Sequence, residues 1–199
     1  MSPKGERVYS EEASYILTDM LSDPSARNIT FGDFFNQKLP FKVALKTGTS
    51  TNYRDGWIVG YTPQHTIAIW VGNFNGQPTA GMSGAQATAP ILIDILNELY
   101  PNGFSSPFPK PEGVVSSEVC SYSGMKPNKF CPHIKRELFI NGMEPEEICN
   151  YHNSSGGMHN LPPQFATWLH GRYKKGVEGN YRLAGFSRNL GKTFQSENR

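Results

Sequence analysis

The stretch that decides the fold is Pro40-Phe-Lys-Val-Ala-Leu-Lys46-Thr47-Gly48-Thr49-Ser50. Within it, the apolar residues Val43 and Leu45 alternate with Lys42 and Ala44, which is the two-residue period of a strand. The stretch therefore predicts a β-strand over Phe41 to Thr47 that ends in a small, hydroxyl-rich segment.

Two further strands and two helices are predicted around it. Trp57 to Tyr61 and Thr66 to Asn73 are rich in β-branched and aromatic residues, and the four residues between them include Pro63, which predicts an antiparallel hairpin. Ser10 to Asp23 begins with an N-capping serine and repeats apolar residues at helical spacing, and Ala87 to Leu99 has the same spacing. The fold class predicted is α+β, in the order helix, three-stranded antiparallel sheet, helix.

Composition divides the chain into three predicted segments. A linker with four prolines follows residue 100. We expect residues 1–103 to hold the sheet and both helices, and residues 104–168 to form a small, irregular extension that contains Cys and Pro. Residues 169–199, with seven basic and two acidic residues, are interpreted as a flexible, solvated tail, ahead of which a last helix is predicted from Gln164.

The 199 residues are 37% hydrophobic and include 20 Gly and 15 Pro, which indicates a globular, loop-rich protein of one or two domains and excludes disorder and collagen. No apolar run reaches the roughly 18 to 20 residues of a membrane span, and the polar start is unlike a signal peptide. From these features we expect neither a span nor a signal in this chain, and no nucleic acid as a partner.

Lys46-Thr47-Gly48 is the motif that points most specifically to a chemical function. A motif of three residues also occurs by chance, and the same residues are compatible with a strand that simply ends in a polar turn. An ammonium group beside hydroxyls at alternate positions offers positive charge and donors to a substrate carboxylate on one face. Gly48 removes a side chain where another backbone must approach, so an extended peptide is able to pair along this edge.

The residues around this triplet resemble a known family. Lys46-Thr-Gly-Thr-Ser, Tyr53-Arg-Asp-Gly-Trp57 and Met82-Ser-Gly-Ala-Gln resemble the end of the transpeptidase domain of class A penicillin-binding proteins. Cys120-Ser-Tyr-Ser-Gly and Cys149-Asn-Tyr-His resemble the segment that follows that domain. The resemblance covers most of the chain, from about residue 8 to residue 168, and within the family it is greatest to the 1C members.

The resemblance implies part of a serine β-lactamase/transpeptidase-like fold and the acyl-enzyme chemistry of peptidoglycan cross-linking. Under it, Lys46 supplies catalytic positive charge and assists proton transfer, and Thr47 and Thr49 bind the substrate carboxylate. The strand at Gly48 lines the acyl group and offers a backbone donor towards the oxyanion, while Ser50 is a weaker substrate-binding candidate. Peptidoglycan stem peptides and β-lactams are the implied ligands, and no cofactor is implied. The implied location is periplasmic or otherwise extracytoplasmic, with the full-length proteins of the family associated with the inner membrane.

The nucleophile motif of that family, Ser-Xaa-Xaa-Lys, is expected far upstream of Lys46, which only 45 residues precede. Ser123-Gly-Met-Lys126 has the spacing but follows the Lys-Thr-Gly strand, so we interpret it as coincidence, as we do the Ser-Xaa-Asn matches at Ser187 and Ser196. We therefore expect the C-terminal portion of a longer transpeptidase, inactive alone, whose site is completed by the remainder of the protein upstream.

Cys120, Cys131 and Cys149 are odd in number and have His133 and His152 close by in the sequence. The short spacing from Cys149 to His152 is typical of metal ligands, so a Cys3His zinc site is one interpretation. The ten residues between Cys120 and Cys131 are unlike a zinc knuckle. In the oxidising compartment that the resemblance implies, a disulfide or free thiols without a metal is the preferred expectation.

Two other functions are open at this point. One is a non-catalytic module that attaches to cell-wall polymer or to a partner protein through the Cys-containing segment and the basic tail. The other is a free-standing zinc-binding interaction domain. Penicillin acylation separates the transpeptidase from both, zinc content identifies the second, and co-sedimentation with peptidoglycan supports the first.

Overall fold

The structure, a computed structural model, describes residues 5–31, 39, 41–103, 106–155, 158–162, 165 and 181–183. The chain divides into two compact units, Met1–Val114 and Val115–Arg199. The boundaries predicted at residues 103 and 168 stay predictions, and the tail and the helix predicted from Gln164 lie almost wholly outside the described residues. No helix in the described part of the chain has both the length and the apolar character needed to cross a bilayer.

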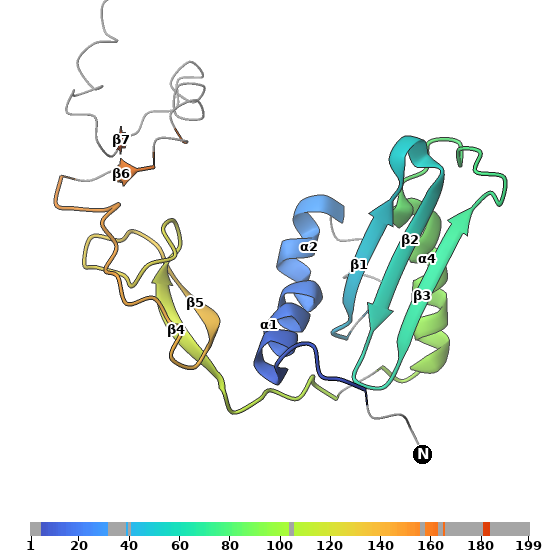
Figure 1. The fold of residues 1–199 in the computed structure, drawn as a ribbon, viewed down its shortest axis with the longest axis horizontal. Coiled ribbons are helices and arrows are strands. Elements are labelled where there is room, and N and C mark those ends of the chain that lie inside the picture. Colours follow the sequence, from blue (N-terminus) through green and yellow to red (C-terminus); the bar gives the residue numbers. More distant parts are fainter. Residues whose placement is uncertain are drawn as a thin grey trace, which may run out of the picture. The chain divides into compact units, whose positions relative to one another are not determined.

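The described residues of the first unit form three α-helices and three strands of one sheet (Figure 1). In chain order these are α1 (Glu11–Ser22), α2 (Pro24–Phe31), β1 (Ala44–Thr49), β2 (Asp55–Tyr61), β3 (Thr66–Gly72) and α4 (Gly84–Leu99), with a short 3-10 turn at Thr51–Tyr53. The strands form one antiparallel sheet in the order β1-β2-β3. The predicted order of helix, three-stranded sheet and helix is therefore confirmed, including the hairpin.

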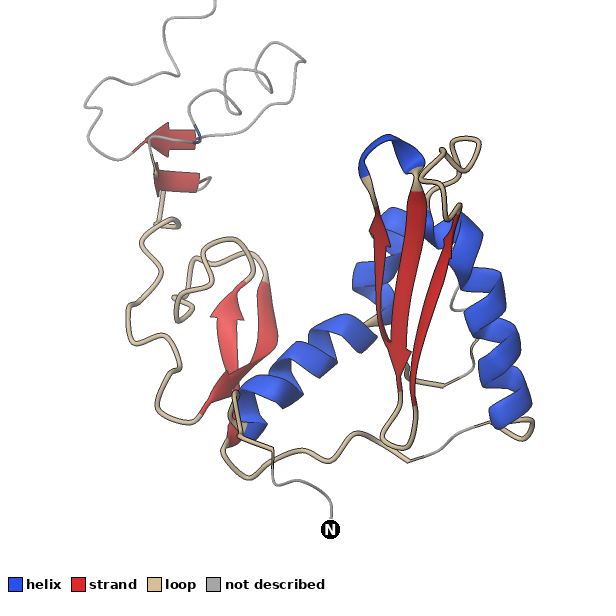
Figure 2. Cartoon of the chain, turned by 45° about the vertical axis from the view of Figure 1, so that its right-hand side comes forward, coloured by secondary structure: helices blue, strands red, loops and turns tan. Residues whose placement is uncertain are grey.

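The core of the first unit lies between α4 and one face of this sheet (Figure 2). Ile58 of β2 and Leu92 and Leu96 of α4 are fully buried there. Gly60 is needed at this contact, because a Cβ at that position would lie 2.9 Å from Cδ2 of Leu92. The amphipathic pattern that predicted α4 thus places its apolar stripe on the sheet.

Helix α4 begins three residues earlier than its apolar pattern predicts. Ser83 accepts a hydrogen bond from the backbone N–H of Gln86, and the Gln86 side chain accepts one from the backbone N–H of Ser83. This reciprocal capping box satisfies two backbone donors at the helix start, so the helix begins at Gly84.

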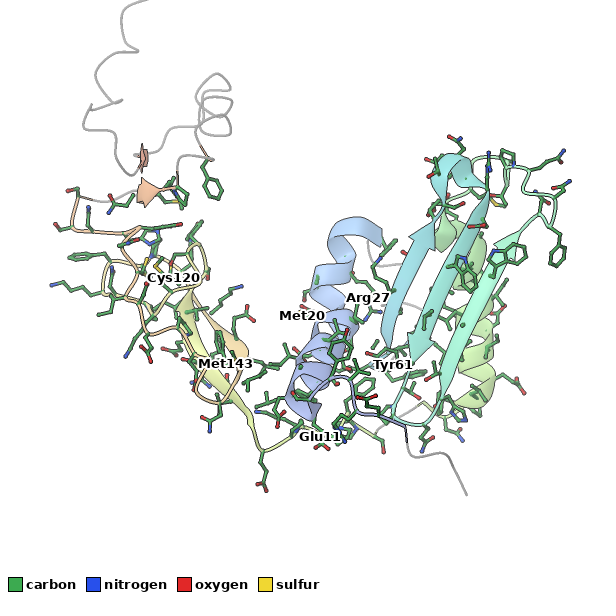
Figure 3. The ribbon with its side chains drawn as sticks, viewed as in Figure 1. Glu11, Met20, Arg27, Tyr61, Cys120 and Met143 are labelled. Carbon is green, nitrogen blue, oxygen red and sulfur yellow. The ribbon has the colours of Figure 1, made fainter. Side chains whose placement is uncertain are left out.

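Helices α1 and α2 lie beside β1 (Figure 1). Ser10 caps α1 by accepting a 3.1 Å hydrogen bond from Ala13 N–H, and Thr18 Oγ1 lies 2.9 Å from the Tyr61 hydroxyl of β2. Arg27 points from α2 towards β1 (Figure 3), where its Nη2 donates a 3.1 Å hydrogen bond to the carbonyl oxygen of Val43. Burial lowers the pKa of Arg27, although the charge of Asp23 acts in the opposite direction.

The second unit contains a two-stranded sheet that the sequence analysis did not predict. It pairs β4 (Val114–Cys120) with β5 (Ile134–Ile140), and a further two-stranded sheet pairs β6 (Met158–Leu161) with β7 (Tyr181–Leu183). The exposure of β5 does not alternate, because its first three residues are exposed and its last four are half-buried. A strand without two-residue alternation gives no periodic signal in the sequence.

Candidate functional site

The Lys46-Thr47-Gly48-Thr49 segment lies within β1, and its side chains divide between the two faces of the sheet. Lys46 is opposite Val59 and Gly48 opposite Trp57, whereas Thr47 is opposite the buried Ile58. Since side chains alternate along a strand, Lys46 and Gly48 share the face away from α4, and Thr47 and Thr49 share the face towards it. This differs from the expectation that the ammonium and the hydroxyls would lie on one face.

The backbone N–H and C=O groups of this segment also alternate in direction: those of one residue point towards β2, and those of the next point towards the outer edge of the sheet. The N–H of Ser50 donates a 3.1 Å hydrogen bond to the Asp55 carbonyl, so even-numbered residues of β1 point their backbone groups at β2. The backbone groups of Thr47 and Thr49 consequently point to the outer edge, where no described strand pairs with β1. Consistent with this, the ammonium of Lys46 donates a 2.7 Å hydrogen bond to the carbonyl oxygen of Thr47.

Thr49 contacts the first residue of α4. The backbone N–H of Gly84 donates a 2.7 Å hydrogen bond to Oγ1 of Thr49. A Cβ at position 84 would lie 1.9 Å from the carbonyl oxygen of Gly48, so only glycine fits here. The helix start at Gly84 thus supports the Lys-Thr-Gly-Thr strand, a role that the sequence analysis missed because the partners are 35 residues apart.

Gly48 itself is not crowded by the described residues. A Cβ at this position would meet only Cβ of Trp57, at an ordinary contact distance of 3.5 Å. The predicted role of Gly48, to let an incoming backbone approach, stays a prediction.

Ser50 shapes the turn that follows the strand. Its Oγ accepts a 2.9 Å hydrogen bond from Asp55 N–H and donates to the Asp55 carbonyl at 3.3 Å. Asn52 and Tyr53 have φ angles of 59° and 53°, and the Tyr53 carbonyl accepts hydrogen bonds from both the backbone N–H and the hydroxyl of Thr79. The hydroxyl of Ser50 is therefore engaged within the protein, and its predicted substrate contact stays a prediction.

The sheet face that carries Lys46 exposes large apolar side chains. Trp57 is 48% exposed and Val59 is 38% exposed, and on β2 they lie directly opposite Gly48 and Lys46 of β1. Apolar side chains gathered on one face of a sheet are typical of a surface that another part of a protein covers.

The second unit brings three cysteines and one histidine together. The sulfur atoms of Cys120, Cys131 and Cys149 and a ring nitrogen of His152 all lie within 4.8 Å of one another. Cys120 lies at the end of β4 (Figure 3), and Cys120, Cys149 and His152 are buried. The three cysteines are free thiols in the structure, and His133, the other histidine considered from the sequence, is not in the group.

Hydrogen bonds surround the sulfur atoms of this group. Ser123 Oγ donates to Cys149 Sγ at 3.3 Å, which engages the serine of the coincidental Ser-Xaa-Xaa-Lys match. Burial acts to raise the pKa of the Cys120 thiol, but hydrogen bonds from Ser123, Tyr122 and Cys149 outweigh it, so the pKa is lowered. Burial raises the pKa of Cys131 to about 11.

Fold and site together define the class: an α+β protein whose antiparallel sheet carries a Lys-Thr-Gly-Thr segment at an open edge, followed by a cysteine-containing unit. The family model of the penicillin-binding protein 1A C-terminal domain matches residues 110–154. The chain belongs to the penicillin-binding proteins and corresponds to their C-terminal region.

Individual relatives agree with this assignment. Penicillin-binding protein 1A of Clostridium perfringens is 33% identical over 163 residues, which are 77% of this chain and 19% of that protein. Penicillin-binding protein 1C of Escherichia coli is 31% identical over 110 residues, which are 53% of this chain and 14% of that protein. The chain thus spans about a fifth or less of the length of these curated relatives.

A solved structure is similar in fold. The crystal structure of penicillin-binding protein 1A from Haemophilus influenzae aligns with a TM-score of 0.61 over 71% of this chain and 22% of that one, at 20% sequence identity. The predicted fold class is therefore confirmed.

Proposed function

We propose that the chain supplies one wall of a peptidoglycan D,D-transpeptidase site, and that the nucleophilic serine of this site lies in the remainder of the protein, upstream of this chain. The observation that carries the proposal is the open edge of β1 at Thr47 and Thr49, within a Lys-Thr-Gly-Thr segment of a penicillin-binding protein.

The open edge suits an extended substrate. Backbone N–H and C=O groups of Thr47 and Thr49 point outwards, so a stem peptide or a ring-opened β-lactam can pair with them as an added strand. A backbone N–H at this edge is also able to stabilise the oxyanion that forms when the serine attacks.

The hydroxyl group of Thr49 is suited to bind a carboxylate. A hydroxyl group has one donor and two acceptor lone pairs, and Thr49 uses an acceptor lone pair for the N–H of Gly84. Its own O–H is left to donate towards the terminal carboxylate of the substrate. Because the acceptor bond fixes where Oγ1 lies, this donor is positioned before the substrate arrives.

Lys46 acts from the other face of the strand. We assign two roles to its ammonium group: it places a positive charge beside the reacting groups, and it takes part in proton transfer from the serine. The exposed Trp57 and Val59 lie on the same face, and covering them with the upstream remainder of the protein would bring the serine next to Lys46. That assembled enzyme would work outside the cytoplasmic membrane, where stem peptides are found.

The test is a chimera in which residues 1–114 replace the matching stretch of a full-length penicillin-binding protein 1A. Acylation by a fluorescent penicillin is measured for the chimera and for its Lys46→Ala and Lys42→Ala variants. Lys42 is a matched control, since it is an exposed lysine just before the same strand. We expect acylation of the chimera, a loss of at least about tenfold in the Lys46→Ala variant, and no loss in the Lys42→Ala variant.

Three results would overturn the proposal. They are a folded chimera that is not acylated, equal acylation after Lys46→Ala, and a penicilloyl adduct on the isolated 199-residue chain that disappears in a Ser123→Ala variant. Thermal unfolding of each chimera shows whether a loss of acylation reflects a loss of folding.

A further inference from the structure

The four ligand atoms of Cys120, Cys131, Cys149 and His152 form a compact group within the second unit. We propose that these residues bind one structural zinc ion, which takes the place of a hydrophobic core in this unit. The proposal concerns a different unit from the Lys46 strand, so it stands or falls independently of the proposed transpeptidase role.

Two sulfur–nitrogen distances within the group fit a tetrahedral ion. With Zn–S bonds of about 2.3 Å and a Zn–N bond of about 2.0–2.1 Å, a tetrahedron places sulfur and nitrogen about 3.5 Å apart. Nδ1 of His152 lies 3.6 Å from the sulfur of Cys120 and 3.4 Å from that of Cys149. Both pairs are therefore already at the separation that a shared zinc ion requires.

The donor set selects zinc among common metal ions. Three thiolates and one imidazole are soft or borderline ligands, and the group includes no carboxylate. Calcium and magnesium bind oxygen ligands, whereas Cys3His is one of the usual sets of structural zinc sites. Four protein ligands leave no open position, which indicates a structural and not a catalytic ion.

The second unit has few buried apolar residues. Five of its described residues are buried, and three of these are proposed ligands; the five are Val119, Cys120, Cys149, His152 and Leu161. Small domains with so little apolar core need a disulfide, a metal or a partner to fold. A zinc ion that joins β4, the loop at Cys131 and the segment at Cys149 supplies that cross-link.

Asn128 holds the ligand loops in position. Its side-chain Nδ2 donates hydrogen bonds to the carbonyl oxygens of Cys149 at 2.6 Å and of His152 at 2.9 Å. Its backbone N–H donates to the sulfur of Cys131 at 3.3 Å. Asn128 thus connects three of the four ligands, in the way that residues around a metal site orient its ligands.

A single disulfide accounts for the group less well. It would join two of the three sulfurs and leave the third cysteine unpaired beside the buried His152. The preferred expectation from the sequence, a disulfide or free thiols, depends on the ten residues between Cys120 and Cys131 and on the oxidising compartment that the resemblance implies. The nearness of a histidine nitrogen to two sulfurs is the structural observation that changes the balance towards a metal.

The test uses the full 199-residue chain, produced with zinc in the medium and purified in a phosphine reductant that does not chelate metals. Elemental analysis is expected to find about one zinc per chain. Native maleimide labelling is expected to leave all three cysteines unlabelled until a strong chelator is added, after which all three react. Replacement of zinc by cobalt is expected to give the intense visible bands of a tetrahedral site and sulfur-to-cobalt charge transfer.

Matched variants identify the ligands. His152→Ala and Cys149→Ser are expected to lower the zinc content at least about tenfold, because each removes a ligand. His133→Ala is the control, since this histidine lies two residues after Cys131 but outside the group. The cobalt spectrum and the chelator-dependent labelling of the unaltered chain test the proposal without any substitution, and so do not depend on the folding of a ligand variant.

Several results would overturn it. They are a metal-free chain with three immediately reactive thiols, a mass two hydrogens lower with one reactive thiol left, full zinc content in the His152→Ala variant, and equal loss in the His133→Ala variant. Iron in place of zinc, seen by elemental analysis and colour, would overturn the identity of the metal.

Discussion

The backbone N–H of Gly84, the first residue of α4, donates a 2.7 Å hydrogen bond to Oγ1 of Thr49, the last residue of β1. Two segments that the chain separates by a whole hairpin therefore meet at one point. The contact fixes the helix against the strand that carries the candidate active-site residues, and the space at Gly84 permits no side chain.

We predict that Gly84→Ala lowers the free energy of unfolding of the first unit by about 1–3 kcal/mol, because the added methyl group overlaps the carbonyl oxygen of Gly48. The measurement is urea unfolding followed by tryptophan fluorescence. Gly5→Ala is the control, since nothing lies within 4 Å of a Cβ at that position. Equal unfolding curves for the two variants would contradict the prediction.

Thr49→Val is predicted to lower the free energy of unfolding by about 1 kcal/mol or more, because it leaves the N–H of Gly84 without its acceptor at nearly the same side-chain volume. Thr49→Ser keeps the hydroxyl and should lose less. Urea unfolding of both variants checks this order, and a Ser variant less stable than the Val variant would argue against it.

Ser10→Ala is predicted to lower stability by about 1 kcal/mol, because it removes the side-chain acceptor of Ala13 N–H at the start of α1. Ser14→Ala is the matched comparison: Ser14 is exposed inside the same helix, where alanine is the better helix former. The two variants should therefore shift the thermal midpoint in opposite directions, and shifts of the same sign and size would refute the capping role.

Tyr100→Phe is predicted to lower stability by about 1 kcal/mol. The Tyr100 hydroxyl lies 2.7 Å from both Oγ1 of Thr62 and Nδ1 of His65, so it joins the end of α4 to the turn between β2 and β3. Thermal unfolding of the variant is the measurement. An unchanged midpoint would mean that water replaces the hydroxyl without cost at this turn.

Asn128→Asp is predicted to raise the rate at which a chelator removes zinc from the second unit by roughly 10 to 100-fold. The substitution keeps the oxygen that accepts from Phe130 N–H but loses the donor to the Cys149 and His152 carbonyls. The rate is measured with a chromogenic chelator in excess. Asn141→Ala, at an exposed asparagine after β5, is the control and should release zinc at the unaltered rate.

The sequence predicted those parts of the fold that short-range periodicity encodes. The β-branched and aromatic content of β2 and β3, the apolar spacing of α1 and α4 and the Pro-containing turn at Pro63 are all local features of the chain, and the structure confirms the elements that they predict. The start of α4 was missed because Ser83 and Gln86 form the capping box before the apolar pattern begins.

The candidate sites depend on long-range contacts, which periodicity does not report. The hydrogen bond between Gly84 and Thr49 has no signature in either segment alone, and the cysteines reach His152 only once β4 and the later loops have folded. One feature was available from the sequence: Lys46 and Thr47 are adjacent in a strand, so their side chains must lie on opposite faces.

The hydrogen bond from Arg27 to the Val43 carbonyl limits how much of the sheet edge is offered to other chains. Among the described residues, Arg27 contacts the chain ahead of β1, Ala44 and Leu45 are buried, and the turn at Thr51–Tyr53 follows Ser50, so the exposed part of β1 is the short stretch Lys46–Thr49. An edge of this length accepts a short peptide but gives another sheet little to extend. If β1 stays unpaired for a ligand, as we propose, this short exposed edge also gives other chains little template for aggregation.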